Sequence, residues 1–196
     1  SSGKQGHAIA AALAGLGAHT TLVTGPTFEA DPPGVEIVRI KSAREMYDAA
    51  LGALPADIAV CAAAVADWRP ATTSDQKIKK HDDGKPPALD MVENPDVLRA
   101  LSNSDNQRPA LVIGFAAETD DVVNNAVVKR TRKGCDWIVA NDVSPSTGTF
   151  GGDENTIHLV TVDGVESWPA LAKADVATQL TKRIVDHLSS LPEAAE

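Results

Sequence analysis

The sequence predicts an α/β fold, in which a mainly parallel β-sheet is flanked by helices. Apolar segments of strand length alternate along the chain with segments that carry helix-start signals. Residues 58–64 and 110–117 are continuously apolar, which is typical of strands covered on both faces in a parallel sheet. The chain has 196 residues, a length that favours one domain and can bury a sizeable core.

Helix-start signals divide the chain into elements. SSGKQG, followed by an alanine-rich segment, predicts a helix that begins at a serine cap and ends near Gly15 or Gly17. Ser42 and Glu45 have the capping-box spacing, and Asn94 predicts a third cap with a proline in the first turn. The later helices are expected over residues 43–54, 94–101, 120–133 and 171–191. The strands before the C-terminal region are expected over residues 20–24, 36–40, 58–64, 110–117 and 137–140.

The C-terminal region follows a different pattern. Residues 156–162 and 165–168 predict a β-hairpin closed by a type I′ turn at Asp163-Gly164. The strand–helix alternation before it is that of a Rossmann-like, doubly wound sheet, which normally begins with a strand. None precedes the first helix here. We therefore expect a single, N-terminally truncated domain over residues 1–196, with its first strand upstream of Ser1 and the hairpin as an extension.

Composition excludes several classes of function. Lys plus Arg number 18 and Asp plus Glu 27, so the net charge of −9 argues against a general nucleic-acid binder. The longest apolar run, residues 58–66, is far shorter than the stretch of about 20 residues that crosses a membrane. Cys61 and Cys135 form no Cys-x-x-Cys pattern, so we expect buried thiols in a reducing compartment.

Basic residues are concentrated in two short windows. Residues 77–80 and 129–133 hold seven of the 18 Lys and Arg residues of this acidic chain. Lys129 and Lys133 are spaced i,i+4, so they project from one helix face and repel each other unless an anion lies between them. Either window alone is explained by a solvated charge run or by cations at a helix C-terminus. Their coincidence favours a polyphosphate site.

Small and polar residues mark the remaining candidates. The SSGKQG helix start suits an anion, although an ordinary capped helix explains it equally well. Ala63 and Ala64 at a strand end leave room for a ligand, and Asp67 is either a group that holds a hydroxyl, amide or metal, or a loop acid paired with a neighbouring arginine. Phe115 is either a surface for stacking a base or a core residue. Asn141, at the next strand end, can reach a ligand or a neighbouring subunit.

Taken together, seven segments resemble phosphopantothenoylcysteine synthetase (phosphopantothenate–cysteine ligase), the C-terminal half of the bifunctional bacterial coenzyme A biosynthesis protein. The segments are SSGKQG, TLVTGP, AAAVADWRP, KIKK, NPDV, GFAAET and ANDVS, in the order and spacing of that family. The resemblance implies a cytoplasmic, homodimeric, Mg²⁺-dependent ligase. It would join 4′-phosphopantothenate to L-cysteine using CTP, through an acyl-cytidylate.

The resemblance also implies roles for individual residues. Lys77 matches the family's catalytic lysine, and Ser1, Gly3 and Gly6 match its phosphate-binding helix start. The positions that match nucleotide-binding residues are Asp67, Lys77, Asn94, Pro95, Asp96, Val97, Phe115, Lys129 and Lys133. Ala63 and Ala64 match the strand end against which phosphopantothenate lies. Asn141, a further substrate-binding candidate, lies in a segment near the family's dimer interface.

Family members carry a first strand, a Gly/Thr-rich loop and an asparagine before SSGK. We therefore expect weak or absent activity from residues 1–196 alone, a fused decarboxylase domain upstream, and no flavin on this domain. Two other functions fit the sequence less well. One is an NAD(P)-dependent oxidoreductase, for which the glycine fingerprint is missing, and the other is a non-catalytic nucleotide-binding module.

Overall fold

The computed structural model describes residues 2–72, 88–143 and 154–190. Its central sheet has five strands in the order β10-β9-β7-β6-β3. Strands β3, β6 and β7 run parallel to one another, β9 joins β7 antiparallel, and β10 pairs with β9 as a hairpin. This parallel-rich sheet with a hairpin at one edge confirms the predicted fold class. The bounds are β3 (Ile58–Cys61), β6 (Leu111–Glu118), β7 (Trp137–Asp142), β9 (Ile157–Val160) and β10 (Val165–Ser167).

A separate pair of parallel strands lies beside this sheet. Strand β1 (Thr20–Thr24) pairs with β2 (Val35–Arg39), and within the described ranges no backbone pairing joins β1 to β3. Two further pairs are antiparallel, β4 (Trp68–Pro70) with β5 (Met91–Glu93), and β8 (Glu154–Asn155) with β11 (Leu171–Ala172). The first strand that we expect upstream of Ser1 stays a prediction.

Helices cover both faces of the central sheet. The helices are α1 (Lys4–Gly15), α2 (Ala43–Gly52), α3 (Val97–Ser102), the short 3₁₀ helix η1 (Asp105–Gln107), α4 (Val122–Lys133) and α5 (Lys173–Ser190). Helices α1 and α5 contact each other and pack with one face of the sheet, whereas α3 and α4 pack with the other. None of the helices in the described ranges is long and apolar enough to span a membrane.

Side-chain alternation along the strands divides the core in two. On the α1–α5 face, Ile113 and Val139 pack with Leu180 of α5. On the α3–α4 face, Val112 and Ile138 pack with Leu98, Ala126 and their neighbours. Any residue of β6 or β7 can therefore be assigned to a face by its position in the strand.

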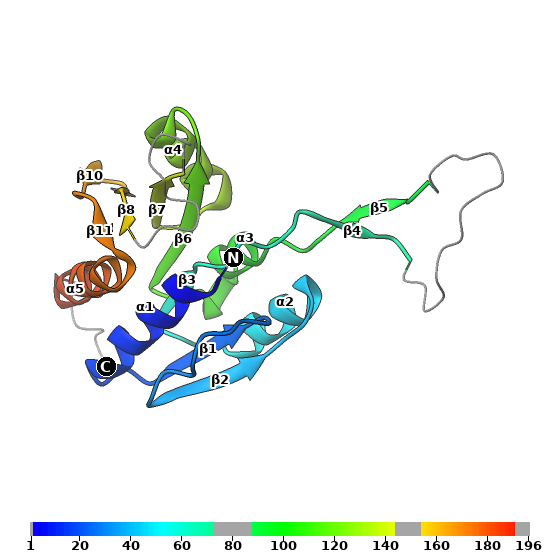
Figure 1. Ribbon diagram of the computed structural model, residues 1–196, viewed down its shortest axis with the longest axis horizontal. Coiled ribbons are helices and arrows are strands. Elements are labelled where there is room, and N and C mark those ends of the chain that lie inside the picture. Colours follow the sequence, from blue (N-terminus) through cyan, green and yellow to red (C-terminus); the bar gives the residue numbers. More distant parts are fainter. Residues whose placement is uncertain (1, 73–87, 144–153, 191–196) are drawn as a thin grey trace.

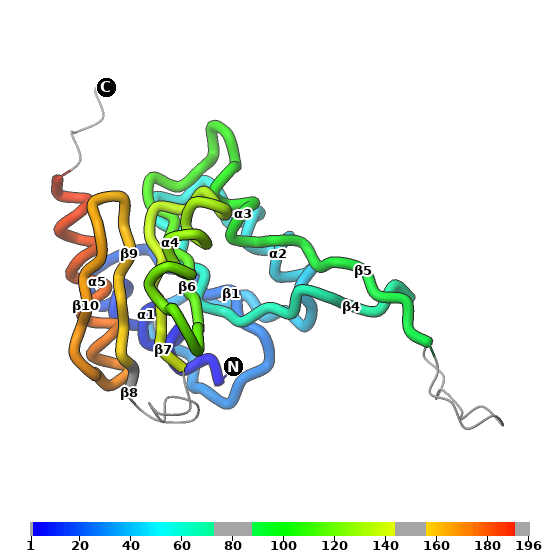
Figure 2. The backbone as a smooth tube through the Cα atoms, turned by 90° about the horizontal axis from the view of Figure 1, so that it is seen from above, coloured from blue at the N-terminus to red at the C-terminus, as the bar shows by residue number. Residues whose placement is uncertain are grey.

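The described residues between β3 and α3 include two short strands that form an extended ribbon. Strands β4 and β5 pair as an antiparallel ribbon that projects from the body of the protein (Figures 1 and 2). Trp68 and Met91 are exposed on it. Neither of these two strands was predicted from the sequence.

Two of the three predicted helix caps are corrected. Helix α1 has Gly3 as its N-cap, at a φ of 83° and with no side-chain cap, so the serine cap is wrong. Helix α3 is capped by Asp96, whose side chain accepts the backbone N–H of Arg99 at 3.0 Å, and not by Asn94. The Ser42 cap of α2 is confirmed, because Ser42 Oγ accepts the backbone N–H of Glu45 at 3.2 Å; the Glu45 carboxylate accepts the backbone N–H of Lys41 rather than that of Ser42.

Two predictions about strands and turns are also wrong. Strand β3 ends at Cys61, so the alanines that follow have left the sheet. The hairpin loop spans residues 161–164, between paired Val160 and Val165, and Asp163 lacks the positive φ that a type I′ turn requires.

Both cysteines are free; Cys135 is buried and Cys61 is partly buried. Burial raises the pKa of the Cys61 thiol to about 12, which makes it unreactive.

Candidate functional site

The start of α1 adjoins the end of β3. A Cβ built on Gly6 would lie 4.0 Å from the Cβ of Ala62, so little separates the helix backbone from the strand end. Ala63 and Ala64, which follow, are both exposed. The structure therefore brings the predicted phosphate-binding helix start and the predicted phosphopantothenate-binding segment to the same edge of the sheet.

The turn before α1 is held by a residue that the sequence did not single out. The hydroxyl of Thr27 donates to the carbonyl oxygen of Ser2 at 2.7 Å. A Cβ on Gly3 would lie only 2.8 Å from this hydroxyl oxygen, so glycine is required here both for its positive φ and for space. In the sequence, the indication of such a role for Thr27 is its place directly after the TLVTGP segment.

His7 lies in the first turn of α1 and is buried. Its Nδ1 lies 3.0 Å from the carbonyl oxygen of Gly3; because a carbonyl only accepts, Nδ1 carries the proton. The His7 ring therefore holds Gly3, the N-cap residue of α1, through this hydrogen bond, and Thr27 holds the neighbouring Ser2. Sequence analysis assigned the histidines no role.

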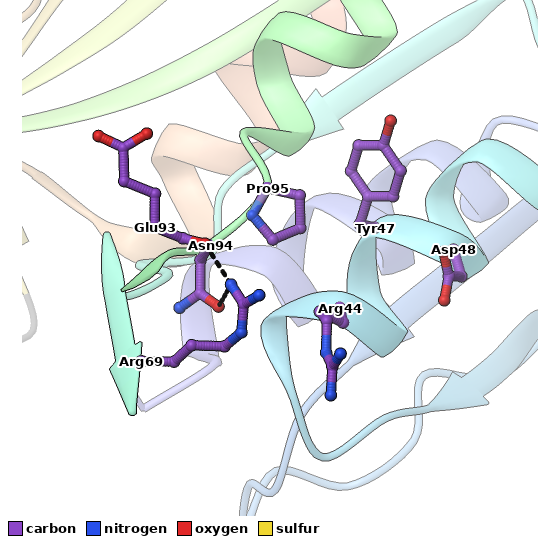
Figure 3. A pocket seen from close by; sticks show the side chains of 7 residues that line it. All are labelled: Arg44, Tyr47, Asp48, Arg69, Glu93, Asn94 and Pro95. Carbon is purple, nitrogen blue, oxygen red and sulfur yellow. Dashed lines mark hydrogen bonds between the residues drawn. The ribbon is translucent and has the colours of Figure 1, made fainter. Parts of the chain in front are cut away.

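Asn94 fastens the base of the β4–β5 ribbon. Its backbone N–H donates to the carbonyl oxygen of Asp67 at 2.8 Å, and its side-chain Nδ2 donates to the carbonyl oxygen of Ala66 at 2.8 Å. Arg69 Nη1 donates to Asn94 Oδ1 at 3.3 Å and also to the carbonyl oxygen of Glu93 (Figure 3). The alternative in which Asp67 is an acid paired with Arg69 is therefore not supported.

A surface groove lies between α2 and the base of the ribbon (Figure 3). It encloses about 500 Å³ and is lined by residues of both charges, Arg44, Tyr47, Asp48, Arg69, Glu93, Asn94 and Pro95. Two of these, Asn94 and Pro95, are predicted nucleotide-binding residues. The groove therefore borders the predicted nucleotide site.

Asp96 and Lys133 form an ion pair between α3 and α4. Burial raises the pKa of the Asp96 carboxyl, but hydrogen bonds from Lys133 and from the Arg99 backbone outweigh burial, so this pKa lies below its ordinary value. Burial lowers the pKa of Lys129; Glu118 opposes that shift and Lys133 adds to it. The predicted repulsion between Lys129 and Lys133 is thus present, and Asp96 compensates the charge of Lys133.

Phe115 and Asn141 are not brought together with these lysines. Along β6 and β7, Phe115 and Asn141 occupy the positions between residues that face α3 and α4, so their side chains lie on the opposite, α1–α5 face of the sheet. Phe115 is partly buried there against the core. Asn141 Oδ1 is buried and has no hydrogen-bond partner within the described ranges. Of the nucleotide-binding candidates, Val97 begins α3 and Asp67 is exposed at the base of the ribbon.

Two predicted site residues, Ser1 and the catalytic candidate Lys77, lie outside the described residues, as does the whole basic window at 77–80. The convergence of the two basic windows on one edge of the sheet stays a prediction. Within the described ranges, no group of three or more His, Cys, Asp or Glu side chains could hold a metal ion.

Comparison with known proteins identifies the family. The family described as the DNA/pantothenate metabolism flavoprotein C-terminal domain matches residues 1–188. The chain belongs to this family. The coenzyme A biosynthesis bifunctional protein CoaBC of Vibrio vulnificus is 42% identical over 185 residues, which cover 94% of the chain and 46% of that protein. The CoaBC protein of Escherichia coli is 44% identical over 187 residues, with coverages of 94% and 46%.

Solved structures agree with this membership. The crystal structure of the C-terminal domain of a CoaBC protein superposes with a TM-score of 0.78 at 32% identity and covers 97% of the chain and 85% of that domain. A Cab2 mutant in complex with phosphopantothenate-cysteine shares the fold, with a TM-score of 0.66 at 14% identity and coverages of 97% and 81%. The chain spans about half the length of its curated family relatives.

Proposed function

We propose that the chain is the ligase domain of coenzyme A biosynthesis, which joins 4′-phosphopantothenate to L-cysteine at the expense of CTP. The observation that carries the proposal is the junction of the SSGKQG helix start with the alanine segment after β3, where Gly6 lies against Ala62. This junction occurs in a chain that is 42% identical to CoaBC over 185 residues. A phosphorylated substrate and a nucleotide need such an edge of backbone donors and small side chains.

The proposed reaction has two steps. A carboxylate oxygen of 4′-phosphopantothenate attacks the α-phosphorus of CTP, the bond from that phosphorus to the bridging oxygen breaks, and pyrophosphate leaves. The amine of cysteine then attacks the carbonyl carbon of the acyl-cytidylate, loses a proton, and expels CMP as the amide forms. Both steps demand positioning and stabilisation of negative charge, which lysines and backbone donors supply.

The proposed roles follow the resemblance to the family. Lys77 stabilises charge on the α-phosphate, and Lys129 and Lys133 hold the other phosphates. The segment from Asn94 to Val97 and Asp67 border the nucleotide at the base of the ribbon. Asp96 directs the Lys133 side chain, because the two already form an ion pair.

Mg²⁺ accompanies CTP in this proposal and neutralises charge on its phosphates. Magnesium is commonly bound by one or two carboxylates together with substrate phosphates, rather than by a protein cage. The α3–α4 side of the sheet offers carboxylates beside lysines, so the chemistry of the donor set fits a magnesium–nucleotide complex.

We place the ligase in the cytoplasm as a homodimer. The resemblance supports a dimer, as do the exposed apolar side chains Trp68, Leu89, Met91 and Val92 on and beside the ribbon. Two free thiols support a reducing compartment. Sedimentation equilibrium tests the dimer: a mass near twice 20.4 kDa is expected, and a monomer at micromolar concentration contradicts it.

Binding measurements test the proposed function on the chain as it stands. Isothermal titration with CTP in the presence of Mg²⁺, and separately with 4′-phosphopantothenate, is expected to give saturable binding of both compounds. CTP binding without phosphopantothenate binding indicates a nucleotide-binding module instead. Binding of NADPH in preference to CTP indicates the oxidoreductase.

A further inference from the structure

Both polar atoms of the Asn94 side chain are engaged within the protein. Its Oδ1 accepts a hydrogen bond from Arg69 Nη1 at 3.3 Å (Figure 3), and its Nδ2 donates to the carbonyl oxygen of Ala66 at 2.8 Å. The same Arg69 nitrogen donates to the carbonyl oxygen of Glu93. Asn94 matches a nucleotide-binding position of the family, but here its amide holds the chain instead of facing a ligand.

These bonds close the base of the β4–β5 ribbon. The ribbon has three paired positions, and the Asn94 backbone N–H bonds to the carbonyl oxygen of Asp67 just beyond the Trp68–Glu93 pair. Short two-stranded ribbons are only marginally stable in water by themselves. The side-chain bonds of the Arg69–Asn94 pair therefore help to keep the two chains in one arrangement where the ribbon leaves the body of the protein.

The Arg69–Asn94 pair lies between two segments that are proposed to border the nucleotide. Asp67 directly precedes β4, and Pro95 directly follows Asn94 and leads into the Asp96 cap of α3. Asp96 in turn forms the ion pair with Lys133. A displacement of Asn94 would therefore move groups on both sides of the ribbon base, and a site that must be ordered on binding has a lower affinity than one held in place beforehand.

Burial indicates what the loss of Arg69 would do. Arg69 and Asn94 are both partly buried, so water can reach the groups that Arg69 bonds and replace its hydrogen bonds. A variant without the guanidinium should therefore fold, but the ribbon base should lose its fixed geometry. The consequence falls on the binding of a ligand rather than on the existence of the fold.

We infer that Arg69 is a positioning residue for the nucleotide. Acting through Asn94, it holds the segments on either side of the ribbon base in the arrangement that binds CTP. This inference rests on the proposed function and extends it in two ways. It gives a role to an arginine that carried none, and it assigns the Asn94 side chain to positioning instead of direct contact with CTP.

Substitutions at Arg69 test the inference without turnover. The affinity of the chain for CTP is measured by isothermal titration in the presence of Mg²⁺. Arg69→Met keeps the aliphatic length but removes the donors, and it is expected to weaken CTP binding about tenfold. One nitrogen makes both bonds, so Arg69→Lys, which also carries one donor nitrogen, should stay within about threefold of wild type. Equal losses in both variants would overturn the inference.

A double-mutant cycle with Asn94→Leu tests whether Arg69 acts through Asn94. In the Asn94→Leu background, Arg69→Met is expected to weaken CTP binding by less than about threefold, because the residue through which Arg69 acts is already gone. A further loss of about tenfold in that background would mean that the two residues act independently. The inference would then be wrong.

Arg44→Met is the matched control. Arg44 lines the same groove as Arg69 and is exposed, and in the part of the chain that the structure describes its guanidinium makes no hydrogen bond or ion pair (Figure 3). The variant removes the same charge and is expected to change CTP affinity by less than about twofold. A loss as large as that in Arg69→Met would show that positive charge in the groove is what matters, and would overturn the inference.

The outcomes separate the inference from the proposed function. If the wild type binds no CTP, the proposed function fails. If the wild type and Arg69→Met bind CTP equally well, the function stands and the role of Arg69 is wrong. Amide hydrogen exchange needs no nucleotide: the Asn94 amide, which bonds to Asp67, should exchange faster in Arg69→Met than in wild type and no faster in Arg44→Met. Unchanged exchange in Arg69→Met overturns the inference.

Discussion

The ion pair between Lys133 and Asp96 joins the last turn of α4 to the N-cap of α3. The same Asp96 side chain accepts the backbone N–H of Arg99, so one carboxylate fixes a helix start and the direction of a lysine. Both residues are predicted to contact the nucleotide. Their pairing compensates the charge of Lys133 and leaves Lys129 as the stronger phosphate-binding candidate of the two.

Asp96→Asn should cost about 0.5–1 kcal/mol of unfolding free energy at pH 7, because asparagine still caps the helix but loses the ion pair. The lowered pKa of Asp96 sets the sign of the pH dependence. Its contribution is present above the ordinary carboxyl pKa and is lost as pH falls through the lower, folded-state value. Urea unfolding from pH 7 down to pH 3 should therefore show the difference from wild type shrinking.

Asp31→Asn is the control for that prediction. Asp31 pairs with Arg39 at 2.7 Å, but both side chains are well exposed, at 45% and 62%. Exposed pairs contribute little, so this variant should change stability by less than about 0.5 kcal/mol. A larger loss in Asp31→Asn than in Asp96→Asn would contradict the role given to the α3–α4 ion pair.

Gly3→Ala should destabilise the chain more than Gly17→Ala. Both glycines have a positive φ, of 83° and 90°, so each alanine variant should cost about 1 kcal/mol for backbone strain. Only at Gly3 does the new Cβ meet another atom, the Thr27 hydroxyl oxygen at 2.8 Å. Urea unfolding measures both variants, and equal losses would show that the Thr27 contact does not constrain the turn.

Gly114→Ala should destabilise the core by about 1–3 kcal/mol through overpacking. A Cβ at this position would lie within 2.8 Å of Ile138 Cδ1 and closer still to a methyl group of Leu98. In the double variant with Leu98→Ala, the two losses should be less than additive, because the smaller side chain makes room. Additive losses in thermal unfolding would mean that the two residues do not compete for space.

Lys129→Gln should weaken CTP binding more than Lys133→Gln does, because Asp96 already compensates Lys133. Burial and the neighbouring cations lower the pKa of Lys129, and a bound triphosphate favours its charged form. CTP affinity should therefore fall as pH rises toward the lowered pKa, at a lower pH than for an ordinary lysine. Titration with CTP between pH 7 and pH 10 measures this; the same pH profile in Lys129→Gln would contradict it.

Local sequence patterns were sufficient for most of the elements and for the Ser42 cap of α2, because those features depend on residues a few positions apart. They failed at the start of α1, where the N-cap depends on Thr27, which contacts Ser2 across 25 residues of sequence. They failed similarly at Asn94, whose side chain bonds to the carbonyl oxygen of Ala66 instead of capping α3. Contacts between distant segments decided both positions.

The candidate site likewise has a part that local patterns predicted and a part that depends on contacts between distant segments. Lys129 and Lys133 were predicted from their helical spacing, and the structure adds the partner of Lys133. Phe115 and Asn141 lie on the other face of the sheet from these lysines. This placement depends on which residues of β6 and β7 face each layer of helices. The hydrogen bond from Arg69 to Asn94 depends on the register of β4 against β5, which no local pattern in either strand specifies.

We propose that this domain activates 4′-phosphopantothenate with CTP. The most direct test is phosphopantothenate-dependent release of pyrophosphate from CTP, measured on the chain and on a form extended at its N-terminus by the corresponding segment of a CoaBC relative. We expect release by the extended form, little or none by residues 1–196 alone, and loss of release in the extended form with Lys77→Gln. No release by the extended form, or normal release with Lys77→Gln, would contradict the account.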